Sequence, residues 1–275
     1  MLTPEQVNHF QTYGFVCCRK LLNESYMASL SGAFDAAMRS ARGGAECPEL
    51  SQDERGFSTS RQQVVPFFDY DAESFYPLLD DDRIMAPFGQ ILGDDFIFTL
   101  SEGIIHAGGT AWHTDAVAPE GMTSMRAALY LDPLGTDDGC LSVIPGSHHT
   151  PYREALRQTI DHLGIAADAV TARCSIVNEP GDVLFMNHKV YHASLTSRAG
   201  RRAIHINCCQ NASKSGNLEH YQWLHRFLEG ETRSWGRFYS DQLIRTAGLR
   251  RRPMIDRALD HGFGDRGPVT HRQDQ

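Results

Sequence analysis

The sequence predicts a mostly β fold with flanking helices (α+β), in the form of a sandwich or barrel of the jelly-roll type. Two observations support this class. From Phe96 to about Asn207, short apolar runs alternate with turn motifs rich in Gly, Pro and Asp, as in sheets built from many short strands. Before and after this stretch, apolar residues recur at helical spacing. The helices are therefore expected to flank a β core.

The chain opens with two predicted helices separated by a short strand. The first begins after Thr3, the N-cap of a capping sequence completed by Gln6, and it stops at Gly14. An apolar run then predicts a strand over 15–18. The second helix is predicted over about 23–42, because four large apolar residues recur at helical spacing: Met27, Leu30, Phe34 and Met38.

The central region begins after a long predicted loop at 43–66, which is rich in polar residues, Gly and Pro. A helical insert at about 152–163 interrupts the strands that follow. The strands themselves are expected at 96–100, 126–131, 141–144, 183–186 and 203–209.

The last part of the chain returns to helical spacing after Ser213, and the sequence shows no internal repeat. We therefore expect one domain over residues 1–275. It comprises N-terminal helices at 1–45, a jelly-roll core at about 90–210 and a C-terminal helical segment at about 214–275.

Composition excludes several classes of protein. The net charge of −8 disfavours nucleic-acid binding, which depends on a basic surface. We find no apolar run long enough to span a bilayer and no secretory signal, so we expect a cytoplasmic protein without a membrane partner. The seven cysteines are odd in number and form no CxxC motif, so we expect reduced thiols.

The candidate chemistry centres on histidine. His113 and Asp115 are separated by one residue in a segment that follows Gly108-Gly109. In an extended backbone, residues i and i+2 point to the same side. An imidazole and a carboxylate aimed together provide two ligands of the facial triad that holds non-haem Fe(II) and leaves coordination positions open.

A third ligand is expected from the segment after the turn Pro180-Gly181-Asp182, which starts a strand that can bring His192 beside the first pair. His188 lies four residues before His192, a spacing that marks a zinc pair on a helix. The apolar run Val183-Leu184-Phe185 predicts a strand instead. On a strand the two histidines would lie too far apart to bind one metal.

The next predicted strand begins with a pair of arginines. A guanidinium fixed in a pocket wall suits the distal carboxylate of a dicarboxylate co-substrate. On a strand, Arg201, Ala203, His205 and Asn207 share a polar face that suits a pocket, whereas Arg202 lies on the other, more apolar face. Arg201 is the expected anchor, and Arg202 is the alternative.

Taken together and in order, these motifs resemble the phytanoyl-CoA dioxygenase-like family of Fe(II)- and 2-oxoglutarate-dependent oxygenases. The resemblance covers roughly residues 1–208. The motifs that carry it are Leu2-Thr3-Pro4-Glu5-Gln6, Gly14-Phe15-Val16, His113-Thr114-Asp115, Asp138-Gly139-Cys140-Leu141, Ile144-Pro145-Gly146-Ser147-His148, Pro180-Gly181-Asp182, His192-Ala193-Ser194 and Arg201-Arg202.

The resemblance implies a double-stranded β-helix, the cupin-like form of the jelly roll. It also implies iron held by His113, Asp115 and His192, with 2-oxoglutarate bound by Arg201 and Ser194, and O₂ as the second co-substrate. Such an enzyme hydroxylates or otherwise oxidises a C–H bond of a small organic molecule and releases succinate and CO₂. The alternative is a catalytically silent metal-binding jelly roll that serves in ligand binding or assembly.

The sequence does not select the substrate, but it suggests pocket residues. Arg126, Ala128 and Tyr130 share one face of their strand, and Ala128 replaces a Trp that some relatives carry. A buried arginine needs an anionic partner. We expect Arg126 either to bind an acidic group of the substrate or of 2-oxoglutarate, or to form a salt bridge with a structural acid, such as Asp132 or Glu102. Trp112 and His106 are further candidates to contact the substrate. A monomer and a homodimer are both compatible with the sequence.

Overall fold

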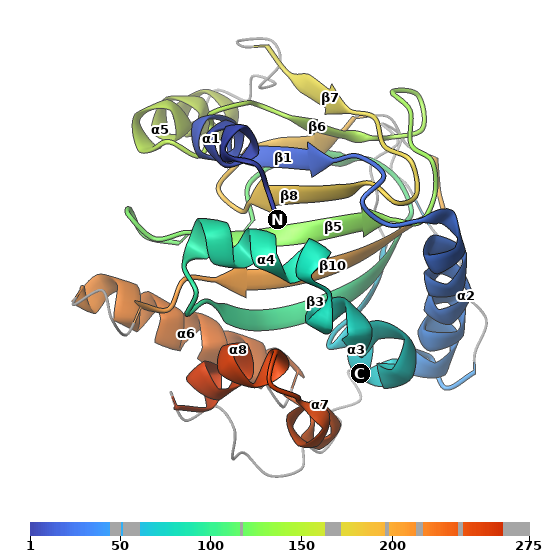
Figure 1. The fold of residues 1–275 in the computed structure, drawn as a ribbon. Helices are drawn as coiled ribbons and strands as arrows, with labels where there is room; N and C mark the ends of the chain where they lie inside the picture. The colour runs from blue at the N-terminus through green and yellow to red at the C-terminus, as the bar shows by residue number, and fades with distance from the viewer. Residues whose placement is uncertain are drawn as a thin grey trace.

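The computed structural model of the chain describes residues 1–44, 51, 61–115, 118–162, 172–195, 198–212, 217–235 and 239–260. Within these ranges the strands form two antiparallel sheets (Figure 1). The larger sheet contains, in spatial order, β1 (Phe15–Cys18), β8 (Val183–Asn187), β5 (Ser124–Tyr130), β10 (Arg201–Cys209), β3 (Ile97–His106) and β2 (Arg61–Val64). The smaller sheet contains β4 (Thr110–His113), β9 (His192–Ser194), β6 (Leu141–Val143) and β7 (Cys174–Ile176).

The helices flank the sheets, as the sequence predicts, and α1 and α5 lie beside β1 and β6 (Figure 1). The helices are α1 (Pro4–Tyr13), α2 (Glu24–Ala41), α3 (Ala72–Asp80), α4 (Asp82–Leu92), α5 (Thr150–Arg157), α6 (Leu218–Trp235), α7 (Asp241–Thr246) and α8 (Arg251–Ala258). Short 3-10 and π segments occupy Phe67–Tyr70 and Gln158–His162. Two antiparallel sheets with flanking helices confirm the predicted class.

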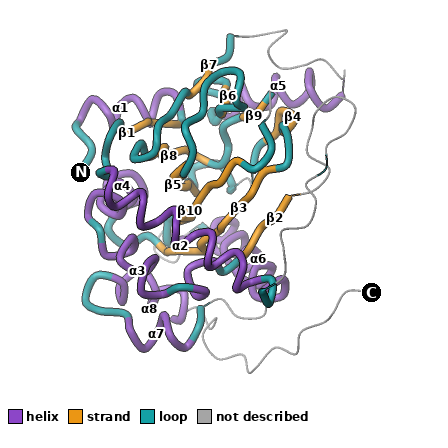
Figure 2. Tube along the Cα trace, turned by 90° about the vertical axis from the view of Figure 1, so that its right-hand side faces the viewer, coloured by secondary structure: helices purple, strands orange, loops and turns teal. Residues whose placement is uncertain are grey.

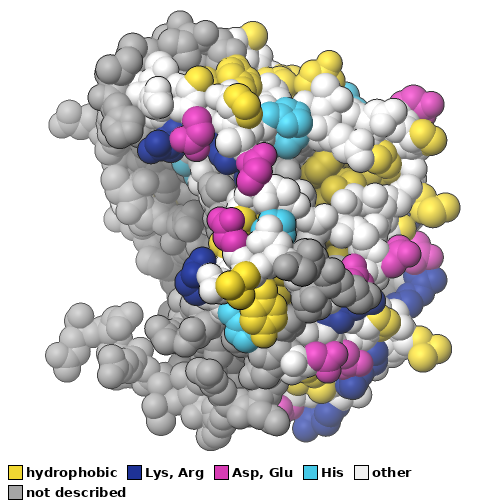
Figure 3. Space-filling model, turned by 90° about the vertical axis from the view of Figure 1, so that its left-hand side faces the viewer, with side chains coloured by type: hydrophobic (Ala, Val, Ile, Leu, Met, Phe, Trp, Pro, Cys, Tyr) yellow, Lys and Arg dark blue, Asp and Glu magenta, His cyan; other side chains and the backbone are white. Residues whose placement is uncertain are grey.

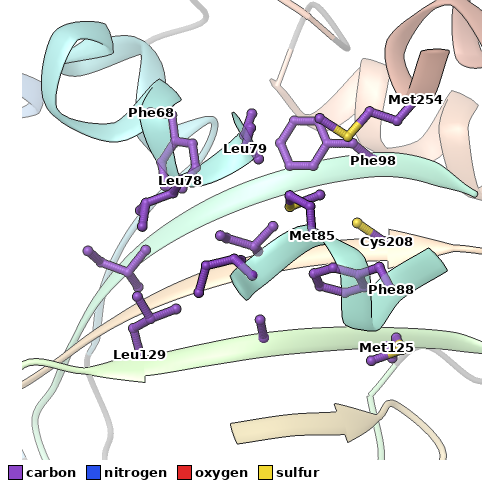
Figure 4. Close-up of a cluster of buried hydrophobic side chains, with 14 of the residues drawn as sticks. Phe68, Leu78, Leu79, Met85, Phe88, Phe98, Met125, Leu129, Cys208 and Met254 are labelled. Carbon is purple, nitrogen blue, oxygen red and sulfur yellow. The ribbon is translucent and has the colours of Figure 1, made fainter. Parts of the chain in front are cut away.

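Alternation along the strands separates two buried regions. In β5, Met125, Ala127 and Leu129 face the helices and join the largest apolar cluster. That cluster packs the larger sheet against α2, α3, α4 and α8, and it includes Phe88, Phe98 and Met254 (Figure 4). The alternate β5 residues face the smaller sheet, which lies on the other side in the rotated view (Figure 2). The space between the two sheets therefore receives every second side chain of β5.

Several elements differ from the sequence-based expectation. The predicted loop at 43–66 contains β2 at its end, which pairs with β3; residues 45–50 and 52–60 lie outside the described part. The sequence-based elements do not include α3 and α4, and each of these helices contains an internal proline. Proline disfavours helix interiors, so it weakens the helical signal of the apolar residues around it.

The surface view shows acidic and basic side chains interspersed over the described part of one face (Figure 3). Among the described residues, no helix is long and apolar enough to cross a membrane. The six described cysteines form no disulfide.

Candidate metal centre and co-substrate pocket

The residues of the predicted triad converge where β4 pairs with β9. His113 lies directly opposite His192 in the pairing, and the centroids of the two rings are 4.2 Å apart. Asp115 follows the end of β4, and its backbone N–H donates a 3.0 Å hydrogen bond to the carbonyl of His188. One potential ligand atom from each of the three side chains lies within 4.8 Å of the other two.

The pairing of β4 with β9 is irregular. Thr110 is opposite Ser194 and His113 is opposite His192, so three residue steps in β4 match two steps in β9. Such a shift is a β-bulge, which re-aims side chains and is often found beside functional sites. Here the side chains of both Thr110 and His113 line the same pocket.

Backbone contacts select the tautomer of both histidines. Nδ1 of His113 lies 2.7 Å from the carbonyl oxygen of Ala111, and Nδ1 of His192 lies 2.9 Å from that of Val190. Because a carbonyl only accepts hydrogen bonds, each Nδ1 carries a proton, and in the neutral imidazole the lone pair is then on Nε2. Histidines that bind metals are commonly oriented in this way.

The electrostatic surroundings also favour a neutral His192. Burial, followed by the charges of His113 and Arg126, holds the pKa of His192 well below its ordinary value. The neutral imidazole is the form that binds a metal. Two neutral imidazoles and one carboxylate form the donor set of a non-haem Fe(II) site, so these residues fit that metal.

A cavity of about 70 Å³ adjoins the triad between the two sheets. Of the other sequence-predicted residues, His106, Arg126, Ala128, Tyr130, Ser194 and Arg201 line it. Lining residues that the sequence does not single out include Ile104, Thr110, Leu141, Leu184 and Met186. His205 also lines the cavity, so the polar face predicted for Arg201 and His205 does point into it.

Arg201 is buried in the wall of the cavity. Its Nη1 donates to the carbonyl of Gly139 and its Nη2 to that of Gly108, both over 2.6 Å. The hydroxyl of Ser194 donates to the same Gly139 oxygen over 2.8 Å, so Ser194 and Arg201 lie side by side. Burial lowers the pKa of Arg201, but a guanidinium remains charged in proteins. The cavity therefore contains a fixed cation beside a hydroxyl group.

Arg202 lies on the opposite face of β10, outside the lining of this cavity. Its guanidinium forms ion pairs with Asp132 and Asp35, each over 2.9 Å. These pairs tie β10 to α2 and to the residues that follow β5.

Arg126 has a different partner from either acid considered in the sequence analysis. Its Nη2 contacts the carboxylate of Asp115, which is a member of the triad. Asp132 pairs with Arg202 instead, and Glu102 contacts His205, whose Nδ1 also lies 3.2 Å from Nη1 of Arg126. Pairings across strands cannot be read from sequence spacing, so the spacing does not identify Asp115 as the partner of Arg126.

Two other residues lie away from the cavity. Trp112 does not line it and packs instead in a separate cluster with Ile144, Leu156 and Tyr191. His188 is buried, with Nδ1 3.1 Å from the hydroxyl of Ser124 and Nε2 3.0 Å from Oδ1 of Asn207. The predicted strand through His188 and His192 is wrong in detail, since β8 ends at Asn187 and a turn precedes β9.

Comparisons of the fold with solved structures agree on one architecture. The carbocyclase SnoK from nogalamycin biosynthesis, described as non-haem and α-ketoglutarate-dependent, has a TM-score of 0.60 at 19% identity, covering 79% of this chain and 90% of SnoK. HygX from Streptomyces hygroscopicus, solved with nickel and 2-oxoglutarate, has a TM-score of 0.59 at 16% identity, covering 76% and 87%. EctD from S. alaskensis, solved with 2-oxoglutarate and 5-hydroxyectoine, has a TM-score of 0.58 at 16% identity, covering 77% of each chain.

The sequence comparisons identify the family. No curated protein sequence matches the chain. The model of the phytanoyl-CoA dioxygenase family matches residues 10–203, a range that includes the triad, Ser194 and both arginines at the start of β10. The expected cupin-like jelly roll is thus confirmed by the similar structures. The chain belongs to the phytanoyl-CoA dioxygenase family of Fe(II)- and 2-oxoglutarate-dependent oxygenases.

Proposed function

We propose that this oxygenase binds Fe(II) through His113, Asp115 and His192 and oxidises a C–H bond of a small organic molecule. The observation that supports this most is the convergence of two imidazoles, each with Nδ1 against a carbonyl, and one carboxylate within 4.8 Å at the wall of a cavity. When bound, the iron and 2-oxoglutarate supply the oxidation of the substrate by O₂, with release of succinate and CO₂.

The protein's own contribution is orientation. The carbonyls of Ala111 and Val190 hold the two rings with Nε2 available, and the N–H bond from Asp115 to His188 fixes the backbone of the third ligand. A mononuclear site of this kind needs three ligands on one side, so that three positions remain for the co-substrates.

Arg201 is the proposed anchor of the C5 carboxylate of 2-oxoglutarate, with Ser194 as a second contact. Arg201 is buried in the cavity wall, and its orientation is set by three backbone carbonyls, those of Gly108, Gly139 and Arg198. A charged guanidinium in a low-dielectric site binds a carboxylate through strong hydrogen bonds. Arg202 is disfavoured in this role, because two carboxylates already occupy its guanidinium outside the cavity.

The primary substrate is proposed to be a small organic molecule that enters beside Ala128, Tyr130 and His106. The similar proteins include one solved with 2-oxoglutarate and 5-hydroxyectoine and one from nogalamycin biosynthesis, so this fold accommodates chemically different small molecules. Ala128, which lines the cavity between Arg126 and Tyr130 along β5, contributes only a methyl group to the wall.

The test of this proposal is an anaerobic titration of the metal-free protein with Fe(II) and then 2-oxoglutarate, followed by a substrate screen that measures succinate. His192→Ala is expected to lose stoichiometric iron and all 2-oxoglutarate turnover, because it removes one of three ligands. His149→Ala is the matched control, since His149 is exposed and hydrogen-bonds to the Thr12 carbonyl away from the cavity.

Two outcomes would contradict the proposal. Stoichiometric iron in His192→Ala would show that the ligand set is wrong. A wild-type protein that binds Fe(II) but neither binds nor turns over 2-oxoglutarate would instead favour the silent metal-binding jelly roll.

A further inference from the structure

A turn that follows Asp115 is held by two side chains from distant parts of the chain. It comprises residues 119–122 and leads towards β5. Its third residue, Gly121, has a φ of 75°, in the left-handed region that favours glycine. The N–H of Met122 donates to the carbonyl of Pro119 over 3.1 Å, so the turn is closed by its own backbone.

The first of the two side chains belongs to Lys189, in the connection between β8 and β9. Its Nζ donates to the carbonyl oxygens of Pro119, over 2.6 Å, and of Met122, over 2.9 Å. Lys189 is buried, and burial, followed by the charge of Arg153, lowers its pKa to about 8. The ammonium is therefore still mostly protonated at neutral pH. Burying such a charge is costly unless it is hydrogen-bonded, and the two carbonyls provide those bonds.

The second side chain belongs to His220, on α6. Its Nε2 lies 2.7 Å from the carbonyl oxygen of Glu120, and because a carbonyl only accepts, this nitrogen carries a proton. The ring also packs against the turn, since a Cβ atom at Gly121 would lie 3.6 Å from Cε1 of His220. α6 lies after the range that the family model matches. Three of the four carbonyls of the turn thus accept hydrogen bonds from side chains far away in the sequence.

The connection that contains Lys189 also contacts the chain on both sides of the turn. The carbonyl of His188 accepts the 3.0 Å hydrogen bond from the N–H of Asp115. The N–H of His188 donates, also over 3.0 Å, to the carbonyl of Ser124, the first residue of β5. Asp115, the turn and Ser124 are therefore all bonded to His188 or Lys189. Since His192 follows Lys189 by three residues, these contacts fix the backbone of Asp115 relative to that of His192.

The position of Asp115 matters for metal binding because of preorganisation. Asp115 lies two residues beyond the end of β4, so its position depends on contacts outside the pairing of β4 with β9. A group that is already held in its bound arrangement loses less conformational freedom on binding. Partners that orient metal ligands therefore contribute to metal affinity without touching the metal.

We propose that Lys189 and His220 are positioning residues that hold the 119–122 turn and, through it, keep Asp115 in place to bind the metal. The inference rests on the proposed function, because it takes Asp115 as a metal ligand. It gives the C-terminal segment a role in the site through α6. The competing role is purely structural: the same hydrogen bonds would stabilise the fold and leave the metal affinity unchanged.

The test compares Lys189→Met, His220→Leu and His220→Gln with wild type. Methionine keeps most of the length of lysine without a donor, and glutamine keeps a donor that leucine lacks. The measurements are the dissociation constant for Fe(II) under anaerobic conditions and the free energy of unfolding of the metal-free protein in urea. His148→Leu is the matched control, because it removes a comparable hydrogen bond, from a half-buried histidine to the carbonyl of Gln11.

Lys189→Met should weaken Fe(II) binding by about tenfold, the lower end of the effect of groups that orient metal ligands. His220→Leu should weaken it by a smaller factor, because one hydrogen bond is lost instead of two, and His220→Gln should restore the wild-type affinity. His148→Leu should keep the wild-type affinity whatever its effect on unfolding. In the metal-free proteins, amide hydrogen exchange within residues 118–124 should be faster in Lys189→Met and His220→Leu but not in His148→Leu.

Wild-type Fe(II) affinity in both Lys189→Met and His220→Leu would overturn the proposal while leaving the proposed function standing. An equal loss of affinity in His148→Leu would also overturn it, because the affinity would then follow overall stability. If the wild-type protein itself binds no Fe(II), the proposed function fails and this inference fails with it. Should Lys189→Met fail to fold, the comparison of His220→Leu with His220→Gln decides alone.

Discussion

Arg201 and Arg202 are neighbours in sequence, yet their guanidiniums lie in opposite environments. Alternation along β10 sends Arg201 into the cavity and Arg202 to the outer face. Arg201 donates to backbone carbonyls, which carry only partial charge, whereas Arg202 is paired with two carboxylates. The charge of Arg202 is therefore already neutralised by its two acids, whereas the charge of Arg201 is available to a dicarboxylate in the cavity.

This difference leads to a prediction for 2-oxoglutarate binding. Arg201→Gln should weaken the affinity roughly thirtyfold or more, since losing one partner of a buried charge pair costs at least about 2 kcal/mol. Arg202→Gln, the matched control, should leave the affinity unchanged. Isothermal titration of the anaerobic Fe(II) protein measures both. A loss confined to Arg202→Gln would reverse the assignment.

His188 leads to a prediction for the pH dependence of stability. Burial, and then the charge of Arg126, lower the pKa of His188 to about 3 in the folded protein, against an ordinary value of 6.5. Between these values the unfolded chain binds a proton that the folded chain does not, so stability falls as the pH decreases through this window.

The substitution His188→Asn removes this titration and keeps a polar side chain. The free energy of unfolding of the metal-free protein should then depend less steeply on pH, by up to about 1.4 kcal/mol per pH unit between pH 3 and 6.5. Denaturant titrations across this range measure the slope. An identical slope in the two proteins would show that His188 does not contribute.

Within β3, Gly103 is a position where no larger side chain fits. A Cβ atom at Gly103 would overlap the ring of Phe67, which is fully buried beneath the sheet. On α2, by contrast, a Cβ atom at Gly32 would meet no atom within 4 Å among those compared.

These two glycines form a matched pair. Gly103→Ala should destabilise the protein by about 1–3 kcal/mol, the usual cost of overpacking a core. Gly32→Ala should stabilise it by up to about 1 kcal/mol, because alanine favours a helix interior. Thermal unfolding measures both changes. Equal effects of the two substitutions would contradict the close approach of Phe67 to β3.

Local signals explain which elements the sequence predicts well. The first helix is confirmed within a residue, because Thr3 and Gln6 form both bonds of a capping box and Gly14 adopts the left-handed conformation that ends it. β2 was missed because its sequence, Arg61-Gln62-Gln63-Val64, is polar and its strand conformation depends on pairing with β3. The same pairing places the side-chain amide of Gln63 where it donates a hydrogen bond to Glu102 on β3.

At the scale of the whole molecule, α8 packs on the larger sheet, most of which lies within the region that the family model matches. Ile255 and Met254 of α8 belong to the apolar cluster that covers the larger sheet, and Arg251 pairs with Asp80 at the end of α3. The family model stops at residue 203, so these contacts extend beyond it.

We therefore predict that α8 unfolds together with the jelly roll. Ile255→Ala should lower the free energy of unfolding by about 2–5 kcal/mol, the usual cost of truncating a buried aliphatic side chain. Leu249→Ala, at a position 96% exposed, should have little effect. Far-ultraviolet circular dichroism and tryptophan fluorescence should give coincident transitions. Separate transitions would show that the C-terminal helices form an independent unit.

The sequence predicts those parts of the candidate site that depend on residues close together in the chain. His113 and Asp115 were selected because they are two residues apart, and His192 because it follows a recognisable turn. The contact between Arg126 and Asp115, and the link to Glu102, depend on which strands are neighbours and in what register. That information arises only when the sheet assembles, so sequence spacing does not contain it.

The irregular pairing of β4 and β9 also bears on how the length of this segment can vary. In a regular strand Thr110 and His113, three residues apart, would point to opposite faces, and the extra residue in the bulge brings both to the cavity. Removing that extra residue would leave two steps in each strand, so the two side chains would still share a face. Loss of one residue here is therefore compatible with the site, because regular pairing would replace the bulge and keep the imidazole of His113 opposite His192.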